Sequence, residues 1–143
     1  MTSNLFGHFH VTPTFAAMKE AEKLFPRYGD YQEARKQALK LAYWPSGESQ
    51  GGRICDLDWE EISGMRAPKA CELRIEDKIG GYNNLRIIFY VFKKDLILPG
   101  DVMPRLWTIS VLQKKTQKWS ANDLTTFRGR VVIHRQRIYG SWL

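Results

Sequence analysis

The hydrophobic residues of this chain change their spacing at residue 71, from the period of a helix to the period of a strand. Before this point, Phe15, Met18, Ala21 and Phe25 follow one another by three, three and four residues, which places them on one face of a helix. After it, apolar residues occupy alternate positions, as on one face of an extended strand. Such a chain buries its apolar residues by packing helices on a sheet, so the pattern predicts the α+β class.

Two helices are expected in the first part of the chain. The first follows a short strand over residues 6–11, with Thr12 as its N-cap and Pro13 at the first helical position. The second runs over residues 30–43, and its buried stripe consists of Tyr31, Ala34, Ala38 and Leu41. Because the break between them is short, the two helices should form an antiparallel hairpin.

The least regular part of the sequence is residues 45–70. Glycine and proline punctuate it at Gly47, Gly51, Gly52, Gly64 and Pro68. We expect an irregular insertion here, with a short helical turn at residues 58–62. The length of the chain otherwise favours a single domain over residues 1–143.

Three strands and a final helix should follow, over residues 71–76, 85–92, 106–112 and 121–138. The outward face of the first strand carries Glu72, Arg74 and Glu76. Ser120 and Asp123 resemble a capping box. The apolar stripe of the helix after it consists of Leu124, Phe127, Val131, His134 and Ile138. The order β-α-α-β-β-β-α predicts an antiparallel sheet packed on a helical hairpin.

The net charge of +7 lies entirely in residues 105–143. Residues 1–104 hold 14 basic and 14 acidic residues, whereas residues 105–143 hold eight basic residues against one acid. A balanced scaffold with a basic end is typical of proteins that meet polyphosphate. Nucleic acid or the ribosome is therefore the favoured partner.

Other classes of protein are disfavoured by what the sequence lacks. Cys55 and Cys71 do not make a disulfide framework, which favours free thiols in a reducing cytoplasm. No apolar run approaches the ~20 residues that span a bilayer, and the N-terminus lacks the pattern of a signal peptide. His8 and His10 are spaced to point the same way from a strand, but no third zinc ligand accompanies them. We expect a cytoplasmic protein with no membrane span, metal or cofactor.

Three segments carry a resemblance to a known family. They are a strand with an arginine near its start, LRIIFY at residues 85–90; a strand that ends in lysines, ISVLQKKTQK at residues 109–118; and the strand-to-helix entry FHVTPTF at residues 9–15. In this order they resemble the RelE/ParE toxin superfamily, and the C-terminal half is similar to its HigB-like, phage-associated branch. The resemblance is good over residues 71–125, weaker over 6–43 and absent over 45–70.

The resemblance implies a RelE/ParE-like fold and the toxin component of a type II toxin-antitoxin system. Such a toxin is a ribosome-dependent mRNA endonuclease, an RNA interferase, and an antitoxin encoded by a neighbouring gene holds it inactive. ParE-type members instead inhibit DNA gyrase, and some members have no demonstrated activity. Fold alone does not choose among these. A catalytically silent nucleic-acid-binding module and a gyrase inhibitor therefore remain the alternatives.

Four residues are candidates for catalysis: Arg86, Lys114, Lys115 and Tyr90. Fixed cations would stabilise the negative charge that develops on the phosphoryl oxygens during metal-independent RNA cleavage. Arg86 could offer its guanidinium to a phosphate, or it could form an ion pair with Glu72 or Glu76. The lysines could meet substrate at a strand end, or lie in a solvated turn. Tyr90 could act as an acid or orienting group, or belong to the core.

Further candidates for RNA contact are Arg74, Lys118, Trp119, Arg128, Arg130, Arg135 and Arg137. Trp119 could stack on a base, or pack as a hydrophobic staple against the last helix. Arg74 could contact a phosphate or form a surface pair. The four arginines form two rows at seven-residue spacing, suited to rRNA phosphates, to an acidic antitoxin segment or to solvent.

The sequence departs from the family pattern in two places. In some members a lysine-rich strand supplies the general base, and the corresponding strand here carries Glu72 and Glu76 instead. The last strand ends in lysines where several members have arginine. His134 falls on the apolar stripe, where a core role is favoured. Catalysis would then depend on positioning of the mRNA by the ribosome.

Overall fold

The computed structural model describes residues 7–143. Its helices are α1 (Phe15–Leu24), α2 (Tyr28–Leu39) and α3 (Ala121–Tyr139), and the 3-10 turns η2 (Lys40–Tyr43) and η3 (Gly140–Trp142) follow α2 and α3. Its strands are β1 (His10–Pro13), β2 (Glu48–Ser49), β3 (Gly52–Arg53), β4 (Trp59–Glu61), β5 (Cys71–Ile75), β6 (Leu85–Tyr90) and β7 (Arg105–Gln113). The α+β class is therefore confirmed.

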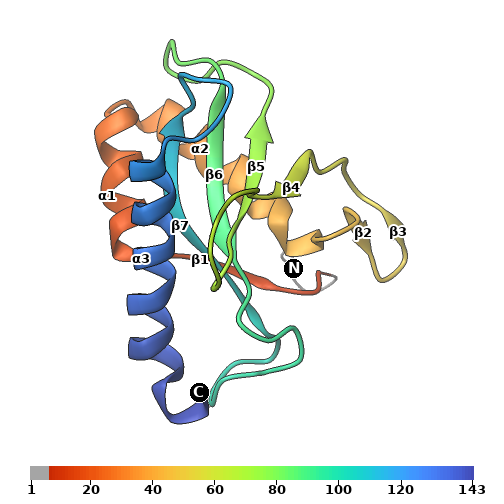
Figure 1. The fold of residues 1–143 in the computed structure, drawn as a ribbon. Coiled ribbons are helices and arrows are strands. Elements are labelled where there is room, and N and C mark those ends of the chain that lie inside the picture. The colour runs from red at the N-terminus through yellow and green to blue at the C-terminus, as the bar shows by residue number, and fades with distance from the viewer. Residues whose placement is uncertain (1–6) are drawn as a thin grey trace.

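Five strands form one sheet in the order β1-β7-β6-β5-β4 (Figure 1). The pairs β4–β5, β5–β6 and β6–β7 are antiparallel, but β1 runs parallel to β7, from His10 opposite Arg105 to Pro13 opposite Thr108. The expectation of a wholly antiparallel sheet was wrong at this edge. A long connection separates β1 from β7, and such a crossover permits the parallel direction.

Helices cover both faces of the sheet, with α2 behind it and α3 in front of it in Figure 1. On the face covered by α1 and α2, the core includes Leu73, Ile87 and Phe89. On the other face, called here the α3 face, Ile88 packs with Phe127 and other residues of α3. All six residues of β6 are buried, as expected of a central strand covered on both sides.

The segment 45–70 extends the sheet. Residues Trp59–Glu61, expected in a helical turn, form β4 and pair with β5, from Trp59 opposite Leu73 to Glu61 opposite Cys71. The helical turn was therefore wrong, because the free edge of β5 provides backbone partners that the sequence of a three-residue strand does not reveal. The short ribbon of β2 and β3 extends to one side of the sheet (Figure 1).

The first helix begins later than expected. Thr12 and Pro13 belong to β1, and Thr14 is the N-cap of α1, with its Oγ1 accepting from the Ala17 N–H at 3.2 Å. Phe15, at the first helical position, is 72% exposed. Met18 is also exposed, so the expected stripe was wrong at these two positions; the expected strand residue Phe6 lies outside the described residues.

The start of α3 was predicted correctly. Ser120 and Asp123 form a capping box, with Ser120 Oγ accepting from Asp123 N at 3.0 Å. Phe127 and Val131 are buried as expected. Ile138 is exposed and Tyr139 is buried in its place, so the expected stripe was wrong at its last position.

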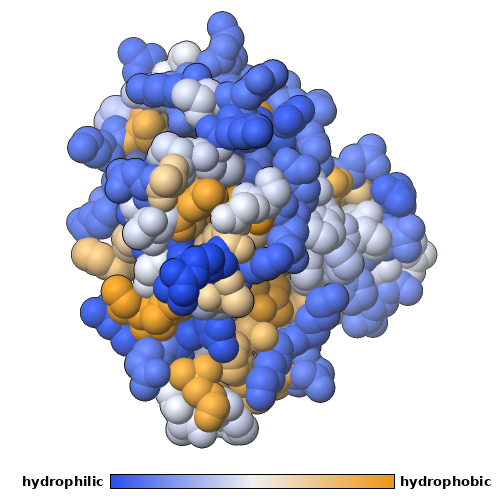
Figure 2. Space-filling model, in the orientation of Figure 1, coloured by the Kyte–Doolittle hydropathy of each residue, from blue (hydrophilic) through white to orange (hydrophobic). Residues whose placement is uncertain are grey.

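Apolar residues also lie on the outer side of α3. Val132, Ile133 and Ile138 are exposed, and Figure 2 shows hydrophobic surface beside the lower half of this helix. None of the described helices is long and apolar enough to cross a membrane.

Candidate nucleic-acid interface

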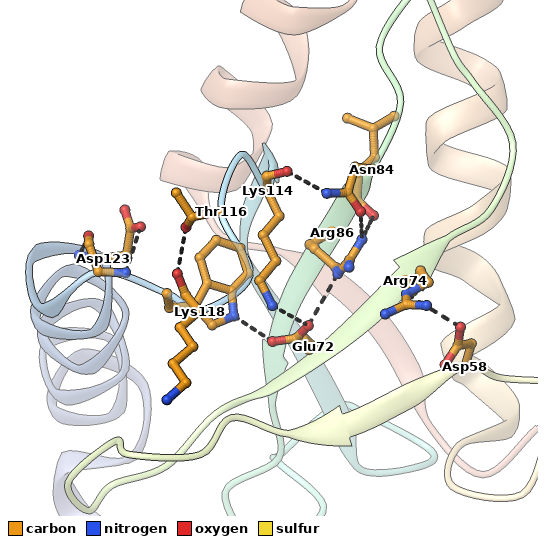
Figure 3. Close-up of polar contacts among 12 residues, drawn as sticks. Asp58, Glu72, Arg74, Asn84, Arg86, Lys114, Thr116, Lys118 and Asp123 are labelled. Atoms are coloured by element: carbon orange, nitrogen blue, oxygen red, sulfur yellow. Dashed lines mark hydrogen bonds and ion pairs between the residues drawn. The ribbon is translucent and has the colours of Figure 1, made fainter.

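A buried ion pair lies on the α3 face of the sheet. The alternation of β5 and β6 turns Glu72 and Arg86 to the same side, and Arg86 Nε donates to Glu72 Oε1 at 3.1 Å (Figure 3). Their side chains are only 6% and 3% exposed. Lys114, just after β7, brings its Nζ to 3.9 Å from the same oxygen. Of the alternatives for Arg86, the ion pair with Glu72 is the one the structure shows.

Asn84 connects this pair to the chain after β7. Its Oδ1 accepts from Arg86 Nη1 at 2.8 Å, and its Nδ2 donates to the Lys114 carbonyl at 2.5 Å. The Lys114 N–H in turn donates to the Asn84 carbonyl at 2.9 Å. Asn84 has a φ of 55°, a left-handed conformation that asparagine adopts more readily than most residues. The start of the lysine-rich segment is therefore held in place by the turn before β6.

Trp119 closes the other end of that segment. Its Nε1 donates to Glu72 Oε2, and its ring packs edge-on against Phe127 of α3, with 5.1 Å between ring centroids. Lys114 Nζ lies 5.1 Å from the centre of the same indole. The half-buried Trp119 therefore packs against the last helix, as one of its two predicted roles required.

Between these anchors, residues 114–119 form a loop that is called here the basic loop. Lys115 and Lys118 are exposed, and neither forms an ion pair with any residue of the described range. The Thr116 hydroxyl donates to the Lys118 carbonyl, which gives the loop internal order. The two ammonium groups are therefore presented to solvent by a loop that is fixed at both ends.

Arg74 is exposed on the α3 face of the sheet, next to Asp58. It stands opposite Arg86 in the register of β5 and β6, and its Nε lies 3.6 Å from Asp58 Oδ2. Both side chains of this pair are 54% exposed, so the pair is weak and solvated. Figure 3 shows Arg74, Lys114 and Lys118 on the same side of the sheet.

Tyr90 lies away from the charged cluster. It is four residues along β6 from Arg86, which is roughly 13 Å of extended strand. Its hydroxyl is hydrogen-bonded to His134 Nδ1, and the His134 ring packs edge-on against Trp107, whose Nε1 donates to Tyr139. The structure therefore does not bring Tyr90 together with the predicted catalytic cations.

Burial determines the protonation of Tyr90, His134 and Tyr139. It raises the pKa of Tyr90 well above its usual value, and it raises the pKa of Tyr139 as well. Burial, with a smaller contribution from Arg137, lowers the pKa of His134 to about 4. At neutral pH His134 is therefore uncharged, and its hydrogen bond joins a neutral imidazole to a protonated Tyr90 hydroxyl.

Arg130 connects α3 to α1 and to β7 through its hydrogen bonds. Its Nη1 donates to Glu20 at 2.7 Å and to the Ile109 carbonyl at 2.9 Å. The same Glu20 carboxylate accepts from Ser110 Oγ at 2.8 Å and from the Val111 N–H at 3.3 Å. Because β1 pairs with β7 only as far as Thr108, Glu20 and Arg130 together cover the part of the β7 edge that β1 leaves open.

The other three arginines of α3 differ in their surroundings. Arg128 donates from Nε to the Ala67 carbonyl at 2.9 Å, and the Arg135 guanidinium lies 4.7 Å from the centre of the Phe92 ring. Arg137 is exposed and has no ion-pair partner within residues 7–143. The predicted rows therefore do not form one free basic surface, since Arg137 is exposed and the other three arginines are partly buried.

Asn84 and Glu20 form contacts that hold this site together, but neither was among the predicted site residues. Asn84 was expected only as part of a turn, although its side chain bridges Arg86 and Lys114. Glu20 lies on α1, and nothing in its local sequence signals its contact with β7 and α3. Within the described range, no three side chains of His, Cys, Asp or Glu are grouped so that they could hold a metal ion.

A scan against protein-family models finds no match for this chain, and a search of curated proteins finds no relative.

Proposed function

We propose that this protein is a toxin of the RelE/ParE type that acts on RNA. The observation that carries the proposal is that Arg74 of β5 and Lys118 of the basic loop lie on the same side of the sheet, with Lys115 exposed on the same loop. Exposed cations distributed over one side of an ordered surface suit an extended phosphate backbone. The α+β class of the fold is compatible with this proposal.

Within this proposal the cations have two roles. Arg86 and Lys114 are close to Glu72 and hold the loop in position. Lys115 and Lys118 are exposed, and they would contact RNA phosphates and stabilise the charge that develops as the 2′-oxygen attacks phosphorus and the bond from phosphorus to the 5′-oxygen breaks. His134 has an internal partner and lies away from this surface, so it would not act as a general base there. Catalysis would depend on the ribosome to position the mRNA.

A catalytically silent RNA-binding module is the second candidate. The observation that favours it is that two of the predicted catalytic residues, Arg86 and Tyr90, are buried with partners inside the protein. The basic loop would serve such a module equally well, because phosphate binding requires only charge and position. A ParE-type action on gyrase would keep the fold and change the target.

An antitoxin from a neighbouring gene would bind α3. The outer side of this helix combines exposed Val132, Ile133 and Ile138 with the exposed Arg137. An amphipathic segment with an acidic face matches both the apolar area and the charge. Co-expression with the neighbouring open reading frame should give a complex that copurifies and that an Arg137→Glu, Ile133→Asp variant of this chain fails to form.

Induction of the chain alone, with mapping of cellular RNA, tests the toxin proposal. Growth should arrest, and mRNA should be cut at positions in phase with codons. Intact mRNA with a supercoiling defect would indicate gyrase, and normal growth with abundant soluble protein would leave only the silent module.

A paired variant tests the role of the basic loop. Lys115→Ala, Lys118→Ala should relieve the arrest and reduce the salt dependence of RNA binding by about 1.4 in log–log slope, at ~0.7 for each phosphate that the protein no longer neutralises. The matched control is Lys23→Ala, Lys36→Ala, which removes two exposed lysines from α1 and α2. An equal reduction in both variants would show that only net charge matters.

A further inference from the structure

Segment 45–70 contributes to a cavity that lies apart from the basic loop. The cavity has a volume of about 540 Å³, within the range of pockets that hold small molecules. Its walls come from the turn after η2, from β4, from the start of β5 and from the residues at and after the end of β6. The insertion with no counterpart in the family resemblance therefore builds a wall of this cavity.

Aromatic rings dominate this wall. Trp44 contacts Trp59 and Phe89 edge-on, with centroids 5.1 Å and 5.9 Å apart, so none of these rings is stacked flat on another. Phe89 is fully buried and Trp44 nearly so. Phe92 also lines the cavity, but its ring is stacked on Tyr139. Trp59 is therefore the ring best placed to stack on a ligand.

Trp59 is held ready for that role. Its Nε1 donates to the Pro45 carbonyl at 2.8 Å, which fixes the indole on the edge strand β4. The residue is half-buried, so part of the ring remains accessible at the cavity. A fixed indole loses little conformational freedom when a flat ring stacks on it.

The charges at the cavity favour an anion. Lys94 is exposed, its Nζ lies 5.1 Å from the centre of the Trp44 ring, and it forms no ion pair in the described part of the chain. Lys69 is also at the cavity, where it pairs with Glu61 at 3.1 Å. One acid against two lysines leaves Lys94 to neutralise a negative group.

Cys71 lines the same cavity but is not a nucleophile there. Burial raises the pKa of its thiol to about 11, so the thiol is protonated at neutral pH. The cavity therefore offers shape, stacking and charge, without a group for covalent chemistry.

We propose that this cavity binds a nucleotide, with the base stacked on Trp59 and the phosphate close to Lys94. Base stacking on an aromatic side chain accepts every base, because each base has a π-face. A free nucleotide and a base of bound RNA share this chemistry. The cavity does not involve Lys115 or Lys118, so the proposal stands apart from that of the toxin.

Titration with AMP, CMP, GMP and UMP, followed through the indole N–H resonances, tests the proposal. Mononucleotides should shift the Trp59 resonance, and Trp59→Leu should weaken binding about 5- to 150-fold, the range measured for loss of a stacked base. Lys94→Ala should weaken it about tenfold. The matched controls are Trp142→Leu, at an exposed indole outside the cavity, and Lys93→Ala, at the neighbouring lysine; both should bind like the original protein.

Single-stranded RNA oligomers distinguish the two sources of the base. If mononucleotides bind, the ligand is a free nucleotide. If only RNA binds, and if Trp59→Leu and Lys94→Ala weaken RNA binding while their controls do not, the ligand is a base of bound RNA. The proposal would be overturned if Lys94→Ala and Lys93→Ala bound mononucleotides and RNA with the same affinity. This comparison holds even if Trp59→Leu fails to fold. The Lys115→Ala, Lys118→Ala variant should keep mononucleotide binding, which separates this result from that of the toxin proposal.

Discussion

Replacement of Glu72 by glutamine should destabilise the protein by about 3–5 kcal/mol, the usual result of removing one partner of a buried ion pair. The Glu72 side chain is 6% exposed, and two cations depend on it: Arg86 at 3.1 Å and Lys114 at 3.9 Å. Glutamine keeps one oxygen to accept from Arg86 or Trp119, but it leaves both cations without a counter-charge. For a domain of this size, the destabilisation corresponds to a fall of roughly 10–15 °C in Tm.

Urea unfolding followed by circular dichroism measures this change as a shift in midpoint at constant m-value. Glu76→Gln is the matched control, because Glu76 directly follows β5 and is exposed; it should change stability by less than about 0.5 kcal/mol. Combining Glu72→Gln with Arg86→Met should recover part of the stability, since one of the uncompensated charges is then removed. A Glu72→Gln variant within about 1 kcal/mol of the original protein would show that this carboxylate does not stabilise the fold through its two cations.

Three further predictions concern residues outside the cluster. Arg130→Ala should cost about 1–3 kcal/mol, because it leaves the Ile109 carbonyl and the β7 edge without a donor, whereas Arg137→Ala should cost almost nothing; urea unfolding compares the two. Since burial lowers the pKa of His134 from 6.5 to about 4 in the folded protein, its contribution to stability is complete above pH 6.5 and is lost as the pH falls toward 4; a His134→Asn variant, melted across that range, should show a weaker pH dependence. Alkylation of Cys71, followed by mass spectrometry, should be slow at pH 7.5 and should still accelerate up to about pH 11; a rate that levels off near pH 8.5 would contradict the raised pKa.

The elements that the sequence predicted well are those whose signal is local. The run at residues 85–92 consists almost entirely of residues that favour strands, and residues 85–90 form the buried central strand β6. The capping box at Ser120 and Asp123 needs only four consecutive residues, and it begins α3 where expected. Alternation along β5 also indicated Glu72 or Glu76 as a partner of Arg86, as the alternative to a phosphate contact, and the pair with Glu72 is the one that forms.

The elements that could not be predicted depend on distant parts of the chain. β4 has three residues and no period of its own, and it is a strand because β5 offers a free edge. β1 has four residues, and its direction is decided by β7, more than 90 positions later. The contact of Tyr90 with His134 likewise joins β6 to a helix 44 residues away, so no local pattern marks it.

For the basic residues of the C-terminal part, the distribution of charge along the sequence differs most from the distribution of charge on the surface. Three of its eight basic residues pair with acids from the neutral part of the chain, as Arg105–Asp101, Lys114–Glu72 and Arg130–Glu20. The charge that remains available is therefore concentrated in the basic loop and near the end of α3. If Lys115 and Lys118 carry RNA binding with help from Arg74, the log–log salt slope should be about −1.4 to −2.1, whereas eight free cations would give about −5.6. A slope near the larger value would mean that the internal pairs open when RNA binds, and that the buried Glu72 is exchanged for phosphate.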